Sequence, residues 1–171
     1  MKSAVFKRLG LIWGMVLMAC FSATSYGAQE MGDREFTLAG AGVSDDDFEN
    51  TIFGASAGIG WFTTKNFEWG VRQNVGLSED GRNLNSATRV FVDYHFDYAA
   101  WQPFIGASLG AIYGSGVEDE FIFGPEIGAK YYVMPKTFIF VQFSYQFSDG
   151  IVDDGIDDGT SFYTLGIGFN F

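Results

Sequence analysis

The last eleven residues of the chain, 161–171, alternate strictly between two kinds of side chain. Successive side chains of an extended strand point to opposite faces, so one face here is apolar and the other small and polar. The strand also stops at an aromatic residue, whereas the ends of soluble domains usually sit in water. We therefore expect the apolar face to contact lipid. Its residues are Tyr163, Leu165, Ile167, Phe169 and Phe171.

The same alternation recurs in seven segments upstream, separated in turn by polar loops and tight turns. The segments are residues 35–43, 51–62, 67–77, 86–96, 103–114, 121–133 and 138–147. The first alternates least clearly, because a run of Gly and Ala follows Leu38. This pattern predicts an all-β fold, an eight-stranded antiparallel up-and-down transmembrane β-barrel. An even strand number places both barrel termini on one side, which in this architecture is the periplasm.

The composition of the chain argues against several classes of fold and of partner. The 171 residues suffice for one domain, and no uninterrupted apolar run has the length of a membrane-spanning helix. The net charge is -11 and the basic residues do not cluster beyond the N-terminus, which argues against nucleic acid as a partner. A single cysteine excludes a disulfide framework.

The N-terminus has the layout of a secretory signal. Basic residues Lys2, Lys7 and Arg8 precede an apolar run over 9–19, and small and polar residues follow to Gly27. We therefore predict a signal peptide over 1–27, a short periplasmic lead-in over 28–34 and an outer-membrane barrel over 35–171. An alternative stays open, because residues 17–20 resemble a lipobox that would make Cys20 a lipidated N-terminus.

Charge placement favours lipid rather than water outside the barrel. From the second predicted strand to the eighth, three acids and three bases all lie on the small-residue face and sum to zero. A charge on the opposite face would cost about 2–4 kcal/mol at the bilayer midplane, and that face carries none. We predict a charge network that fills a narrow lumen. Its members are Glu68, Arg72, Arg89, Asp93, Glu126 and Lys130, with His95 on the same face.

Aromatic residues mark the two predicted membrane interfaces. Trp61, Trp69 and Trp101 all sit beside the predicted turns, where a girdle of interfacial aromatics belongs. A second girdle is expected near the loops. Its members are Phe53, Tyr113, Phe121, Phe147 and Tyr163.

Residues 35–171 resemble the outer-membrane β-barrel family that contains the OmpA transmembrane domain and OmpX. The terminal strand, which ends at Phe171, is similar to the C-terminal signal that the barrel-insertion machinery reads in this family. Residues 61–68, a turn and strand, and 102–107, the start of a strand, are similar to sequences of the family. The resemblance implies the outer membrane of a Gram-negative bacterium, with lipid and lipopolysaccharide as partners. No peptidoglycan-binding domain follows Phe171, so a tether to the cell wall is not implied.

We expect a structural or surface-interaction role, with acidic loops displayed toward lipopolysaccharide, host surfaces or other cells. A narrow channel for ions or small solutes and a lipid-modifying enzyme are the two alternatives. Eight strands leave an interior only wide enough for side chains, which favours a network that plugs the lumen over an ion path. His95 is the only histidine and no nucleophile is placed with it, so we expect neither an enzyme nor a cofactor.

The predicted loops hold 14 of the 21 acidic residues. The run over 153–159 alternates Asp pairs with Gly, as calcium loops do, but it lacks the spacing of an EF-hand. Divalent cations that bridge the loops to lipopolysaccharide phosphates are one hypothesis. Loops that only solubilise and repel one another are the other.

Overall fold

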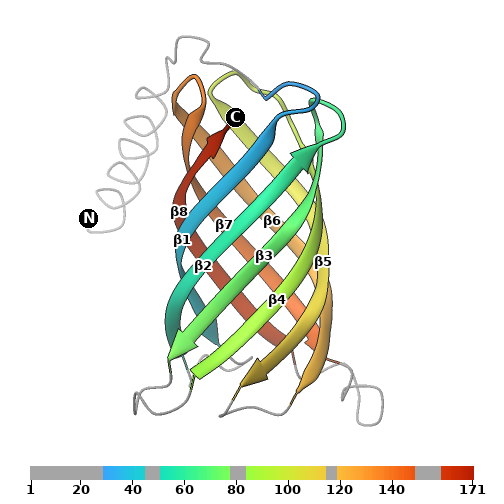
Figure 1. Ribbon diagram of the computed structural model, residues 1–171, viewed down its shortest axis with the longest axis vertical. Helices are drawn as coiled ribbons and strands as arrows, with labels where there is room; N and C mark the ends of the chain where they lie inside the picture. Colours follow the sequence, from blue (N-terminus) through green and yellow to red (C-terminus); the bar gives the residue numbers. More distant parts are fainter. Residues whose placement is uncertain (1–28, 45–50, 78–83, 115–118, 149–158) are drawn as a thin grey trace, which may run out of the picture.

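The computed structural model describes residues 29–44, 51–77, 84–114, 119–148 and 159–171. Eight antiparallel strands pair in chain order, and β1 pairs with β8 to close a barrel (Figure 1). This confirms the predicted fold class. The strands are β1 (Arg34–Ser44), β2 (Thr51–Phe62), β3 (Phe67–Leu77), β4 (Leu84–His95), β5 (Trp101–Gly114), β6 (Glu120–Met134), β7 (Thr137–Ser148) and β8 (Gly159–Asn170).

The start of β1 and the end of β8 lie at the same end of the barrel. The backbones of Arg34 and Phe171 exchange two hydrogen bonds of 2.9 Å each. The three tight connections, β2–β3, β4–β5 and β6–β7, lie at this same end, uppermost in Figure 1. We call it the turn end, and we call the opposite end the loop end.

The bounds of β2 and β3 match the prediction, and the other six strands differ from it by one or two residues at their ends. Three strands, β4, β5 and β8, begin two residues earlier than predicted, and β5 begins at Trp101 rather than at Pro103. Trp101 pairs with Tyr131 of β6 and also bridges back to Tyr98 across the turn. Cross-strand pairing therefore extends the strand beyond the proline that we took as its start.

The inner and outer faces of the barrel wall differ in burial, as the alternation of side chains along each strand requires. In β7 the side chains of Phe138, Phe140 and Gln142 are buried inside the barrel, whereas Ile139 and Val141 between them are 48% and 52% exposed. The C-terminal strand behaves in the same way, with Leu165 65% exposed on the outside. Among the described residues, no helix is long and apolar enough to cross a membrane.

The tryptophans lie on the outer face at the turn end. Trp61 of β2 and Trp69 of β3 are register partners and stack, with ring centroids 4.8 Å apart. Trp101 of β5 packs against Tyr131 of β6 with centroids 5.2 Å apart. Tyr113, Phe121, Phe147 and Tyr163 lie in the loop-end parts of their strands, and the side chain of Phe53 is outside the described part.

One polar residue on the outer face was not anticipated from the sequence. Gln73 of β3 is directly opposite Thr88 of β4, and its amide oxygen accepts a hydrogen bond from the Thr88 hydroxyl. Its amide nitrogen donates to the Tyr113 hydroxyl at 3.2 Å and to the Asn74 carbonyl at 3.1 Å. The amide is thus hydrogen-bonded at both ends, which removes most of the cost of a polar group on an apolar face.

Candidate functional site in the barrel lumen

Three strands supply the predicted lumen charges. Spacings of two or four residues along β3, β4 and β6 place these side chains on one face of each strand, and closure of the barrel turns that face inward. The structure buries every one of them inside the barrel. They are Glu68, Arg72, Arg89, Asp93, His95, Glu126 and Lys130.

Lys130 organises the lumen at the turn end. Its ammonium lies 2.6 and 2.7 Å from the two carboxylate oxygens of Glu35 and 3.0 Å from Oε2 of Glu68. The same oxygen of Glu68 lies 2.9 Å from Nε2 of His95. Four side chains from β1, β3, β4 and β6 are thereby linked across the barrel.

Aromatic rings surround this ammonium. Lys130 Nζ lies 5.5, 5.7 and 5.0 Å from the ring centroids of Phe62, Phe104 and Phe138. The His95 ring packs on Phe62 and Phe104, each at a centroid distance of 5.3 Å. A cation over the face of an aromatic ring is attracted by the ring quadrupole, so these rings both exclude water and stabilise the charge.

A second ion pair lies deeper in the barrel. Arg72 Nη1 donates to both oxygens of Glu126, at 3.3 and 3.2 Å, and its guanidinium stacks on Phe91 at 4.4 Å. Asp93 lies so close to the wall that a Cβ on Gly106 would sit 1.9 Å from Asp93 Oδ1. Glycine is required at that position.

Arg89 departs from the predicted paired network. Its guanidinium donates to the Ser144 hydroxyl at 2.9 Å and to the Asn74 side-chain oxygen at 3.4 Å, and it stacks on Phe162 at 4.3 Å. Within the described residues it forms no ion pair. The prediction that three acids pair with three bases is therefore wrong for this base, which is held by neutral acceptors and a ring.

The predicted charge balance also needs correction, because Glu35 of β1 belongs to the lumen and is 3% exposed. The lumen then holds four carboxylates, from Glu35, Glu68, Asp93 and Glu126, against three bases. The formal sum is three minus four, or -1, with His95 neutral. Sequence reasoning missed Glu35 because it counted only from the second strand, where alternation was clearer.

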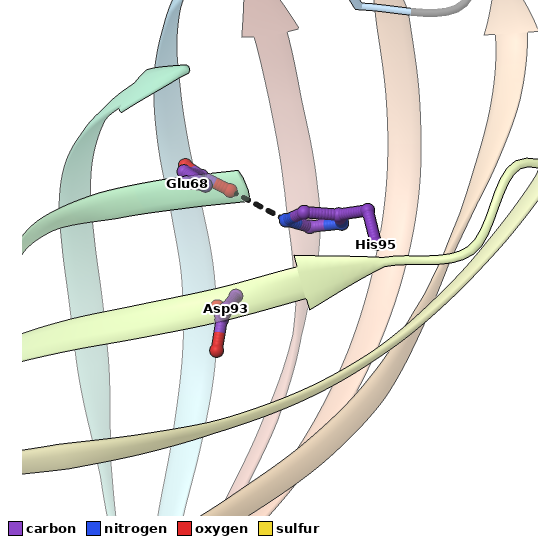
Figure 2. A group of neighbouring side chains, drawn as sticks. All are labelled: Glu68, Asp93 and His95. Atoms are coloured by element: carbon purple, nitrogen blue, oxygen red, sulfur yellow. Dashed lines mark hydrogen bonds and ion pairs between the residues drawn. The ribbon is translucent and has the colours of Figure 1, made fainter. Parts of the chain in front are cut away.

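Glu68, Asp93 and His95 form the most compact group of potential ligands (Figure 2). Each offers one ligand atom, and the three atoms lie within 4.8 Å of one another. The group thus has donor atoms for a cation, and no hydroxyl or thiol nucleophile is bonded to Glu68 or His95 among the described residues.

The space left in this part of the lumen is small. A cavity of about 10 Å³ is bordered by Glu35, Glu68, Arg72, Asp93 and Lys130 and by aromatic rings. A volume of roughly 10–15 Å³ holds a single water molecule. This part of the lumen is therefore packed with side chains. The four aspartates of the run over 153–159 lie outside the described residues, as do most residues of the predicted loops.

Several solved structures are similar to this barrel. No protein-family model and no curated protein matches the chain. The N-terminal β-barrel domain of Pseudomonas aeruginosa OprF matches with a TM-score of 0.61 and 20% identity, over 84% of this chain and 100% of that one. Neisserial surface protein A matches with a TM-score of 0.61 and 15% identity, over 81% and 96%.

A third structure, Ail, the attachment invasion locus protein of Yersinia pestis, matches with a TM-score of 0.53 and 14% identity, over 82% of this chain and 99% of that one. The chain has the fold of the small outer-membrane β-barrels. The likeness lies in the fold, since identity is 20% or less in all three. Apolar residues such as Leu165 and Val141 are exposed on the outer face of this barrel.

Proposed function

We propose that this outer-membrane barrel has a structural and surface-interaction role. The observation that carries the proposal is the packing of the lumen around Arg72 and Lys130, where a cavity of about 10 Å³ leaves no room for a solute larger than water. In this proposal, residues 1–27 direct export, and 28–34 form the lead-in. The turn end faces the periplasm, and the loop end faces outward.

The charge of the chain supports a role for the loop end. Thirteen of 21 acidic residues fall in the segments that join strands there, and only one basic residue, Arg82, does. Loops carried on a rigid scaffold commonly hold the specificity of such folds. One structural neighbour, Ail, is named for attachment and invasion. We propose that the acidic segments at the loop end of this chain contact lipopolysaccharide, host surfaces or other cells.

The C-terminal strand supports a further partner, the barrel-insertion machinery. Leu165, Ile167, Phe169 and Phe171 are all at least 40% exposed on the outer face, and Tyr163 lies on the same face. A continuous apolar stripe at the end of the chain is accessible to a recognising surface before the barrel enters the membrane. We propose that these five residues form that signal.

A narrow channel is the second candidate. It is favoured by the series of charged side chains that runs along the lumen from Lys130 through Arg72 to Arg89. Conduction would require the pairs of Lys130 and Arg72 with their carboxylates to break. We do not favour the lipid-modifying enzyme, because the only histidine lies at the turn end and is paired with Glu68.

Two measurements test the proposal. Bacteria that display the barrel are compared with variants in which the acidic residues of one loop at a time are changed to Asn or Gln, and binding to host cells is measured. We expect at least one variant to lose binding while its barrel stays folded. Equal binding by all variants and by cells without the protein would contradict the surface role.

Planar-bilayer recording distinguishes the second candidate. We expect the refolded barrel to show no steady openings, because Arg72 and Glu126 close the centre of the lumen. Steady openings that Arg72→Gln abolishes would favour the channel instead.

A further inference from the structure

We propose that the lumen binds one divalent transition-metal ion between Glu68, Asp93 and His95. The three ligand atoms lie within 4.8 Å of one another, and the residues are only 1%, 2% and 0% exposed. Bonds of about 2.0–2.2 Å to nitrogen and oxygen ligands hold opposite ligands up to roughly 4.4 Å apart, so small side-chain rotations close the site. Figure 2 shows Glu68 reaching from β3 toward His95, with Asp93 beside them on β4.

The charges of the lumen leave two carboxylates for such an ion. Lys130 is held by both oxygens of Glu35, and Arg72 by both oxygens of Glu126. Glu68 then has one contact with Lys130, Asp93 has no ion pair among the described residues, and the formal sum of the lumen is -1 with Arg89 included. An uncompensated charge in a low-dielectric interior is costly, so a cation between these two groups is stabilising.

Lys130 is the competitor for this position. Its ammonium lies 3.0 Å from Oε2 of Glu68, the oxygen that also faces His95. When a metal takes this oxygen, Lys130 keeps its two shorter contacts with Glu35, at 2.6 and 2.7 Å. Glu35 therefore makes Glu68 available, because it satisfies the ammonium without help.

A second observation points to a ligand beside two of the three residues. A cavity of about 10 Å³ is bordered by Glu68 and Asp93, by the cations Arg72 and Lys130 and by Gln142 from β7, whereas His95 does not line it. Gln142 is 5% exposed, and neither its amide nitrogen nor its amide oxygen has a hydrogen-bond partner among the described residues. The volume suits one ion or one water molecule, and a buried amide beside it is placed to bind that ion or a water on it.

The donor set selects the class of metal. One imidazole and two carboxylates suit zinc, cobalt or nickel, whereas calcium and magnesium prefer oxygen ligands alone. In the pair with Glu68, a neutral His95 carries its proton on Nε2 and donates it to the carboxylate. When Nε2 binds a metal instead, the ring carries its proton on Nδ1, which has no hydrogen-bond partner in the described part of the chain. The imidazole stays neutral in both states, so no net proton is lost.

The single histidine makes the test specific. The protein is labelled with ¹⁵N-histidine, refolded in detergent micelles and titrated with Zn²⁺ alone while its ring resonances are recorded. We expect the Nε2 signal to shift and to saturate at one equivalent, and Mg²⁺ at the same concentration to leave it unchanged. A ring signal that Zn²⁺ does not move overturns the proposal and assigns any bound zinc to acids elsewhere, such as those of the loops.

Variants locate the ligands. Asp93→Asn and Glu68→Gln should each weaken zinc binding by at least about tenfold in a chelator competition. The matched control is Asp97→Asn, which removes an exposed acid two residues beyond His95 and should leave the affinity unchanged. Folding of each variant is checked by its circular dichroism spectrum. If both variants fold and bind zinc with wild-type affinity, the proposed site is wrong. If a variant does not fold, the titration of ¹⁵N-histidine in the wild-type protein tests the proposal instead.

Discussion

Lys130 and Arg89 are both cations buried in the lumen, yet they are held in opposite ways. Lys130, near the turn end, contacts two carboxylates and three aromatic rings. Arg89 contacts a hydroxyl, an amide oxygen and one ring, and it forms no ion pair among the described residues. The lumen therefore contains one region built on charge pairing and another built on neutral acceptors.

The difference shows what each cation leaves behind when it is removed. Loss of Lys130 leaves buried carboxylates without their counter-charge, whereas loss of Arg89 leaves only a hydroxyl and an amide. A buried charge without its partner is far more costly than an unpaired neutral group. The two regions should respond very differently to matched substitutions.

The largest effect is expected for Lys130→Met, which keeps a long apolar side chain but removes the ammonium from Glu35 and Glu68. We expect it to lower the free energy of unfolding in lipid vesicles by about 3–5 kcal/mol, measured by urea titration. The double variant Lys130→Met with Glu35→Gln should recover about 1–3 kcal/mol of that loss. No recovery would contradict the account of Lys130 as a charge partner.

Gly60→Ala tests how the wall positions Glu68. A Cβ at Gly60 would lie 1.8 Å from Glu68 Oε1, so the carboxylate, whose other oxygen contacts Lys130 and His95, must shift. We expect a loss of about 1–3 kcal/mol in the same titration. Gly40→Ala is the control, because its Cβ would meet nothing closer than 4.0 Å, and it should gain about 0.5–1 kcal/mol. Equal effects at the two sites would contradict this packing.

Arg89→Met should be milder than Lys130→Met. It removes hydrogen bonds to Ser144 and Asn74 but leaves no carboxylate that was paired with Arg89, so we expect a loss of about 1–2 kcal/mol. A loss as large as that of Lys130→Met would show that Arg89 compensates the lumen acids at longer range. The comparison between the two regions would then fail.

The smallest effect is expected on the outer face, where Gln73 is also held by neutral partners. In Gln73→Leu, Thr88 and Tyr113 keep their mutual contact of 2.9 Å, and the new side chain suits lipid. Side-chain hydrogen bonds in membranes average about 0.6 kcal/mol, so the unfolding free energy should change by less than about 1 kcal/mol. A larger loss would indicate that the amide stabilises more than its own hydrogen bonds.

Much of this barrel could be predicted from the sequence, because alternation with period two acts within each strand and needs no knowledge of distant residues. The inward positions of Arg72, Glu126 and Lys130 follow from it directly. Glu35 was harder to place, since the Gly and Ala residues that follow in β1 offer no contrast between the two faces.

Partners across the barrel could not be predicted, because alternation gives the face of a residue but not its neighbours. The contact between Arg89 and Ser144 joins residues 55 positions apart, and it depends on strand tilt and barrel closure. The same is true of Gln73, whose polar side chain on an apolar face is explained only by its cross-strand neighbours Thr88 and Tyr113.

The central claim is that alternate residues divide between a lipid-facing exterior and a packed lumen. It is tested most directly by refolding the purified protein in buffer with and without detergent, and by measuring its mass by sedimentation and its strand content by circular dichroism. We expect a folded monomer only when detergent is present, because side chains such as Leu165 are otherwise exposed to water. A folded, monomeric protein in plain buffer would contradict the claim.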